Sequence, residues 1–147
     1  MDRGVALAAA VTIGGVVAMQ APLNSSLGRI VGGTQASMVA LGISFVALAA
    51  LSAVVGGFSG LARLDEAPLH VALGGGLIGA LYVGSIVWTV RELGAGGLTA
   101  ATISGQLALA VVIDHFGWLG VAKSPITASK LLGIALLGLG TWFVVRD

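Results

Sequence analysis

The chain has 147 residues, of which 57% are hydrophobic and 9% are charged, and its net charge is +1. A water-soluble domain carries about 25% charged residues because its surface faces water, so most of this protein's surface is expected to face lipid. The small net charge argues against a nucleic-acid partner, which needs a concentrated basic patch.

Charged residues divide the sequence into apolar pieces of about 20 residues, the length that crosses the hydrocarbon core of a bilayer. The predicted spans are residues 4–23, 35–58, 68–90, 93–113 and 125–145. A membrane β-barrel would instead show segments of about ten residues that alternate between apolar and polar. We therefore predict an all-α integral membrane protein, with residues 1–147 forming a single transmembrane domain of five helices.

The first span lacks the strongly basic start of a secretory signal, so we interpret it as a retained helix. It ends in a polar stretch that contains Gln20, Pro22 and Asn24. Gln20 and Asn24 are four residues apart and share a face if the helix continues. Pro22 favours a kink or a break. The stretch is either a broken helix that presents amides to a ligand or a proline-terminated helix followed by a capping loop, and the sequence leaves both open.

The third predicted span is rich in glycine. Gly75 and Gly79 have the spacing that lets two membrane helices approach closely, which predicts a packing role. Tyr82 is a candidate wall of a substrate cavity, because aromatic rings suit cationic or apolar ligands. Trp88, near the end of the span, is typical of an interfacial anchor.

The fourth predicted span carries the most informative polar residues. Thr99, Thr102 and Gln106 lie on one face of a helix at about 100° per residue. Gln106 falls deep in the membrane, where an unpaired amide costs several kcal/mol. It is expected to bond another helix, a water molecule or a substrate, and it is our first candidate for a substrate contact.

Asp114 follows this span, where a carboxylate faces the negative end of the helix dipole. We expect compensation by a basic neighbour, His115, Lys123 or Lys130. The alternative is a carboxylate that takes up a proton and couples it to transport. Glu92 is a weaker candidate for that role, because Arg91 and Glu92 are most simply solvated charges in a short loop.

The basic residues give almost no bias toward one orientation in the membrane. Five spans place four of them on the side of the N-terminus and three on the other: Arg3, Arg63, Lys123 and Lys130 against Arg29, Arg91 and Arg146. Cytoplasmic loops normally carry an excess of Lys and Arg. One interpretation is that the chain inserts both ways and pairs antiparallel, and the other is a single orientation set by a weak bias.

No pattern in the sequence indicates an enzyme. There is no phosphate-binding loop of the Walker type and no nucleophilic serine with a candidate base. The chain has no cysteine and two histidines, so no metal site and no other cofactor is expected.

Several segments together resemble the small YdcZ-like proteins of the bacterial drug/metabolite transporter superfamily. They are LNSSLGR (23–29), the glycine-rich start of the third span, GQL (105–107), IDHFG (113–117) and the last helix with Gly133, Gly138 and Gly140. The resemblance covers essentially the whole chain. The chain departs from that pattern at Arg91-Glu92, where an apolar, proline-containing approach to Gly94 is expected.

The resemblance implies a multi-pass, five-helix half-transporter in the bacterial inner membrane. Such a chain pairs as an inverted ten-helix homodimer or with a paralogous partner. The expected function is then alternating-access transport of a small molecule by that dimer, with Gly133 among the packing residues. The alternatives are a dual-topology ion channel and a non-transporting membrane subunit that needs a partner.

Overall fold

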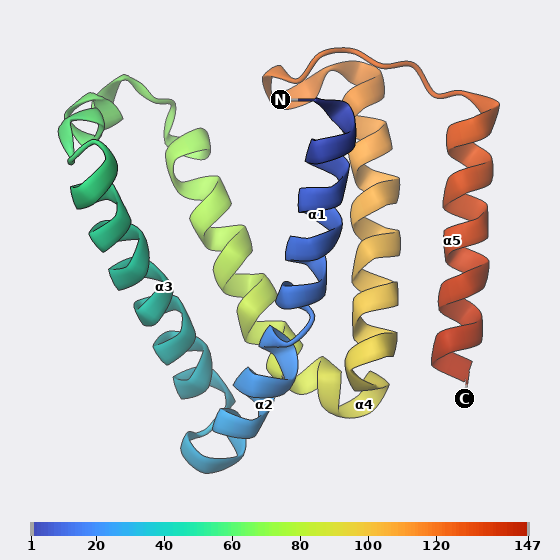
Figure 1. The fold of residues 1–147 in the computed structure, drawn as a ribbon, viewed down its shortest axis with the longest axis horizontal. Coiled ribbons are helices and arrows are strands. Elements are labelled where there is room, and N and C mark those ends of the chain that lie inside the picture. Colours follow the sequence, from blue (N-terminus) through green and yellow to red (C-terminus); the bar gives the residue numbers. More distant parts are fainter. Residues whose placement is uncertain (1, 147) are drawn as a thin grey trace. The chain divides into compact units, whose positions relative to one another are not determined.

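The computed structural model describes residues 2–146, and every regular element in that range is helical. The long helices are α1 (Arg3–Val17), α2 (Gln20–Val31), α3 (Gly33–Val55), α4 (Leu69–Phe116) and α5 (Ala128–Arg146) (Figure 1). Two 3-10 helices, η1 (Ser59–Glu66) and η2 (Trp118–Gly120), lie in the connections. The predicted all-α fold is confirmed.

Four helical stretches are long and apolar enough to cross a membrane: Arg3–Val31, Gly33–Val55, Leu69–Phe116 and Ala128–Arg146. The stretch of 48 residues that forms α4 would be about 72 Å long as a straight helix, more than twice the hydrocarbon thickness of about 30 Å. Gly94 breaks α4 with φ 67° and ψ 172°, a conformation that glycine adopts without strain. The break divides α4 into two parts, residues 69–93 and 95–116, each about as long as one membrane crossing.

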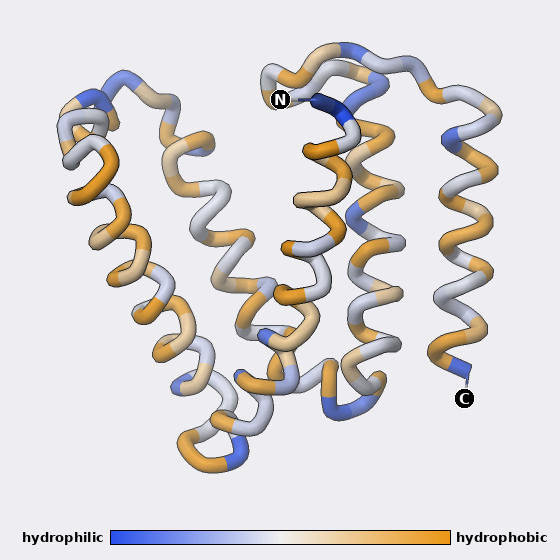
Figure 2. The backbone as a smooth tube through the Cα atoms, in the orientation of Figure 1, coloured by the Kyte–Doolittle hydropathy of each residue, from blue (hydrophilic) through white to orange (hydrophobic). Residues whose placement is uncertain are grey.

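The helices leave most of their apolar surface uncovered by the chain itself. Figure 2 shows hydrophobic residues along the helix bodies, with hydrophilic residues concentrated at helix ends and connections. No residue of α1 or α5 is buried, and α3 buries only Ala36 and Ser37. This is the pattern of a protein whose solvent is lipid, because the hydrocarbon core accepts apolar side chains that water would not.

The chain divides into two compact units, one ending at Arg91 and the other beginning at Glu92. In the first unit, Gly32 joins α2 directly to α3 through a backbone with φ 96°. The core of this unit includes Ala36 on α3 and Ile86 and Val87 on α4, each at most 2% exposed. The buried Ser37 hydroxyl donates a 3.2 Å hydrogen bond to the Val83 carbonyl, which ties α3 to α4.

In the second unit, the part of α4 after Gly94 runs beside α5 (Figure 1). The hydroxyls of Ser104 and Thr141 lie 2.6 Å apart, and Thr141 also donates a 3.0 Å hydrogen bond to the Ala100 carbonyl. These bonds join the two helices of the unit within their apolar lengths.

The first span differs in its bounds from the predicted residues 4–23. The helix stops at Val17, resumes at Gln20 and continues to Val31, so the polar stretch is helical rather than a loop. Pro22 explains the interruption, because its ring excludes a helical hydrogen bond to the Ala18 carbonyl four residues earlier. Proline is tolerated in the first turn of α2, where backbone N–H groups lack helical partners in any case. Of the two interpretations of this stretch, the structure has the broken helix.

Candidate functional site

The polar stretch on α2 contains two buried polar side chains. Asn24 is 8% exposed and Ser25 is 5% exposed. The Asn24 side-chain nitrogen, Nδ2, is buried and has no hydrogen-bond partner. Leaving such a donor unpaired costs about 1–3 kcal/mol, so it is a candidate contact for an acceptor group. Gln20, the other predicted amide, lies one turn earlier on the same helix and is half-buried.

Arg91 is the functional candidate that the sequence analysis missed. Its Nε donates a 3.1 Å hydrogen bond to the Ser25 hydroxyl, and its Nη2 donates a 3.4 Å bond to the Ser25 carbonyl. Arg91 lies within α4 rather than in the expected short loop; it is exposed, and its guanidinium also bonds Ser25 on α2. Glu92 lies in the same helix, is exposed, and forms no ion pair within residues 2–146.

Two glycines make the close approach of this part of α4 possible. A Cβ atom on Gly28 would lie 2.9 Å from Val87 Cγ1 and 3.3 Å from Arg91 Nη2. A Cβ atom on Gly33 would collide with the indole of Trp88. Trp88 therefore packs on the backbone at the turn between α2 and α3, although 59% of it remains exposed. The sequence signal for this close packing was the pair Gly28 and Gly33, which flank the end of α2 at Val31.

The glycines predicted to pack helices behave differently from Gly28 and Gly33. A Cβ atom on Gly75, Gly79 or Gly133 would meet nothing within 4 Å in the described chain. Close helix packing at these three positions stays a prediction. Tyr82, the predicted cavity wall, is half-buried on the same helix as Gly75 and Gly79.

The predicted polar face of the fourth span lies on the second part of α4. Thr99 donates a 2.7 Å hydrogen bond to the Ala95 carbonyl, and Thr102 donates a 2.9 Å bond to the Leu98 carbonyl. These hydroxyls are satisfied within their own helix. Gln106 is exposed and makes no side-chain hydrogen bond to the rest of residues 2–146, although it lies near the middle of the segment that follows Gly94. Ser104 and Thr141, rather than Gln106, join α4 to α5.

The segment before α5, residues 124–126, lies against the end of α4 next to Asp114. The Ser124 N–H donates a 2.9 Å bond to the Asp114 carbonyl, and the Ile126 N–H donates a 3.2 Å bond to His115 Nδ1. Lys130 donates to the Ser124 hydroxyl at 2.7 Å and to the Ser124 carbonyl at 3.1 Å. The half-buried Asp114 carboxylate has no salt bridge within residues 2–146, so the expected compensation by a basic side chain is not present in that range.

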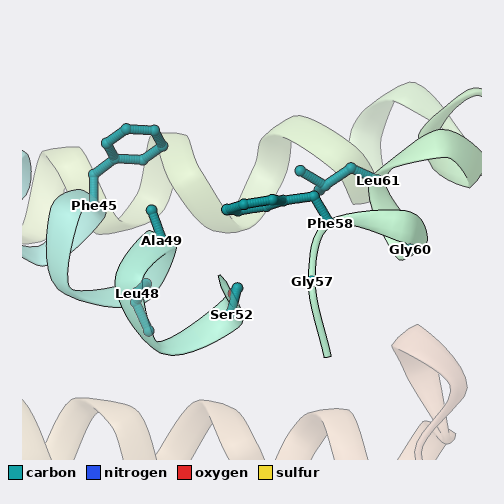
Figure 3. Close-up of a pocket in the computed structure, with 8 residues that line it drawn as sticks. All are labelled: Phe45, Leu48, Ala49, Ser52, Gly57, Phe58, Gly60 and Leu61. Atoms are coloured by element: carbon teal, nitrogen blue, oxygen red, sulfur yellow. The ribbon is translucent and has the colours of Figure 1, made fainter. Parts of the chain in front are cut away.

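A further pocket of about 360 Å³ lies where α3 meets η1. Figure 3 shows the Phe58 ring extending back toward Ala49 on α3. Apart from Ser52, the lining is apolar or glycine: Phe45, Leu48, Ala49, Gly57, Phe58, Gly60 and Leu61. The pocket offers apolar contact and few polar groups that would orient a solute. Among residues 2–146, no group of three or more His, Asp or Glu side chains is placed to hold a metal ion.

Four helical stretches long and apolar enough to cross a membrane, with buried polar side chains on α2, are typical of an α-helical membrane protein. The comparison with known families specifies the class further. The chain belongs to the family described as "Putative inner membrane exporter, YdcZ", which matches residues 5–143. No curated protein and no solved structure matches the chain. The family supports a transporter of the drug/metabolite type rather than an enzyme.

Proposed function

We propose that the protein is a secondary transporter for a small molecule that works as an inverted-topology homodimer. In this arrangement two copies cross the membrane in opposite orientations and alternate access to a site between them. Gln106, Thr99 and Thr102 of both copies line that site, with Gln20, Asn24 and Tyr82 contributing from the first units. Inverted repeats with a mid-membrane site are a common architecture of secondary transporters.

Gln106 is the observation that carries the proposal. Its amide lies about 18 Å along the helix from Gly94 at 1.5 Å per residue, which is mid-depth for a span of this length. It has no hydrogen bond within the described chain and is exposed. Hydrocarbon offers no partner for an amide, so the partner is a second copy, water or the solute. A substrate site between two copies supplies all three.

The surface of the chain supports the pairing. Gly75, Gly79 and Gly133 have open space where a Cβ would lie, which leaves room for the close approach of another helix. The basic residues divide almost evenly between the two membrane faces, which removes the usual barrier to insertion in both orientations.

Solute flux in proteoliposomes tests the transport function. Gln106→Ala removes an amide with no partner in its own chain, so the protomer should fold normally. We expect initial rates to fall by about five- to tenfold, the worth of one lost hydrogen bond of about 1 kcal/mol or slightly more. Gln35→Ala removes an exposed glutamine in the first turn of α3 and is the matched control. Unchanged flux in Gln106→Ala would remove this residue from the site, and ion currents that do not saturate would indicate a channel.

The absence of native cysteine makes the topology directly measurable. Ser59→Cys and Thr34→Cys place single thiols at exposed positions at opposite ends of α3 without changing the charge. With a membrane-impermeant maleimide, dual insertion predicts that about half of each variant is labelled from one side. Complete labelling of one variant and none of the other would show a single orientation and overturn the inverted homodimer.

A further inference from the structure

The guanidinium of Arg91 has unused hydrogen-bonding capacity. Of its five N–H donors, its two hydrogen bonds to Ser25 use two and leave three. The ion pair in the part of the chain that the structure describes joins Arg63 to Glu66, so no described carboxylate neutralises Arg91. Arg91 is exposed, so its remaining N–H groups are open to an acceptor from outside the chain.

Asn24 supplies a second unused donor on α2. It precedes Ser25 on α2, and its buried Nδ2 has no partner. Asn24 Nδ2 and three of the Arg91 N–H groups therefore have no acceptor in the described residues. A planar guanidinium and an amide N–H match the oxygens of a carboxylate or a phosphate, which accept several hydrogen bonds at once. From these two observations we propose that Asn24, Ser25 and Arg91 form an anion-binding subsite for a carboxylate or phosphate group.

The subsite lies toward the ends of the helical segments that form it. Arg91 lies three residues before the break at Gly94, and Asn24 lies seven residues before the end of α2. At 1.5 Å per residue these separations are about 5 Å and 10 Å. Arg29 is four residues after Ser25 on the same face of α2 and is also exposed. Two guanidinium groups thus give this end of the first unit a positive potential toward an approaching anion.

Ser25 is the positioning residue of this subsite. Its hydroxyl and its carbonyl both accept from Arg91, which holds the guanidinium against α2 and leaves three of its N–H groups without a partner. The occupant is an anionic group of the transported solute, an assignment that rests on the proposed transport function. The same chemistry would suit the phosphate of an anionic lipid, so the experiment separates these two sources.

Anion binding to the full chain is measured by the fluorescence of Trp88, which lies three residues before Arg91. Trp118→Phe and Trp142→Phe leave Trp88 as the single tryptophan. Sodium acetate and inorganic phosphate are titrated at constant ionic strength in neutral detergent, with chloride as the balancing anion. We expect a saturable change for at least one of these probes. A linear response in the parent protein overturns the subsite without any further variant.

Two substitutions and one control then locate the bound anion. Asn24→Asp keeps the shape of the side chain but removes its free N–H donor. Arg91→Lys keeps the positive charge but removes the planar guanidinium that can bind two oxygens at once. Each substitution should weaken anion binding by about tenfold. Arg63→Gln removes an exposed arginine outside the subsite and should leave the affinity unchanged. Thermal unfolding checks that each variant is folded. Unchanged affinity in both Asn24→Asp and Arg91→Lys overturns the assignment.

Lipid composition distinguishes the two sources of the anionic group. In phosphatidylcholine vesicles the acetate titration reports the empty subsite. Phosphatidylglycerol that raises the apparent acetate dissociation constant assigns the subsite to a lipid phosphate and overturns the solute assignment. If phosphatidylglycerol leaves the acetate dissociation constant unchanged, the result supports an anionic group of the solute as the occupant. Acetate binding without any solute flux would support the subsite and overturn the proposed function. Solute flux without anion binding would support the proposed function and overturn the subsite.

Discussion

Arg91 and Ser25 lie 66 positions apart in the chain, and Arg91 Nε donates a 3.1 Å hydrogen bond to the buried Ser25 hydroxyl. The bond fastens α2 to the first part of α4 at the place where Gly28 lets the two backbones approach. A charged donor near the end of a span thus has a structural partner on α2 and free N–H groups besides. This bond therefore bears both on the stability of the first unit and on the proposed anion-binding subsite.

Ser25→Ala should lower the free energy of unfolding by about 1–2 kcal/mol. The change removes an acceptor from a charged donor, and such hydrogen bonds contribute about 1.5–3 kcal/mol, with the lower end suited to a partly exposed arginine. Equilibrium unfolding in mixed micelles measures it. Ser44→Ala is the control, because the exposed Ser44 hydroxyl bonds only the Ala40 carbonyl of its own helix. Equal effects of the two changes would contradict the role of the Arg91 bond.

Gly28→Ala should destabilise the protein by about 1–3 kcal/mol through overpacking. The added methyl carbon would lie 2.9 Å from Val87 Cγ1, and Val87 is fully buried with little room to move. Gly42→Ala offers the comparison, since a Cβ there meets nothing within 4 Å and a helical alanine gains about 0.5–1 kcal/mol over glycine. Opposite signs in thermal unfolding are expected, and a stabilising Gly28→Ala would contradict the close approach.

Gly94→Ala should destabilise the break in α4. The backbone there has φ 67° and ψ 172°, a region open essentially to glycine, and a Cβ in it costs about 1–3 kcal/mol. Gly105→Ala, within the helical part of α4, is the control and should be neutral or stabilising. Helix content by circular dichroism together with thermal unfolding distinguishes strain at the break from general loss of structure. Tolerance of alanine at Gly94 would mean that the break does not need a positive φ.

The exposed connection between α3 and α4 predicts a pH effect. Arg63 donates two hydrogen bonds to the Glu66 carboxylate, at 2.8 and 2.7 Å, which lowers the pKa of Glu66 below its ordinary value. A lowered pKa means that the pair stabilises the fold above the ordinary glutamate pKa and loses this effect as the pH falls through the folded-state value. Arg63→Gln should raise the pKa of Glu66, as followed by NMR titration. An unchanged titration would show that the pair does not persist in solution.

Asp114→Asn tests whether Asp114 couples transport to protons, one of the two roles that the sequence left open. The half-buried carboxylate has no salt bridge within residues 2–146, so its substitution should leave the fold stable. If Asp114 carries the coupled proton, uptake driven by an imposed pH gradient should be lost while exchange of solute across the membrane continues. Glu92→Gln provides the parallel test of the second candidate. Retained gradient-driven uptake in both variants would exclude these two carboxylates as couplers.

The sequence by itself determined the fold class and the apolar character of the long helices. Hydropathy is a property of consecutive residues, and lipid requires each apolar run to satisfy its own backbone, so runs of about 20 residues predict helices without knowledge of their neighbours. The family resemblance rested on short motifs of the same local kind, and the match over residues 5–143 confirmed it. The break near Pro22 was predictable as one of two outcomes, because proline acts on the helix turn that contains it.

Only the tertiary structure decided which polar side chains meet. Arg91 and Ser25, and likewise Ser104 and Thr141, are joined because their helices are rotated and shifted into contact over long sequence separations. The sequence marked Gln106 as a candidate for bonding between helices, yet Ser104, two residues earlier and on a different face, makes that bond. Periodicity fixes which residues share a face of a helix. Which face meets a partner helix depends on the packing of all side chains along both helices, and the sequence of one helix alone does not contain this information.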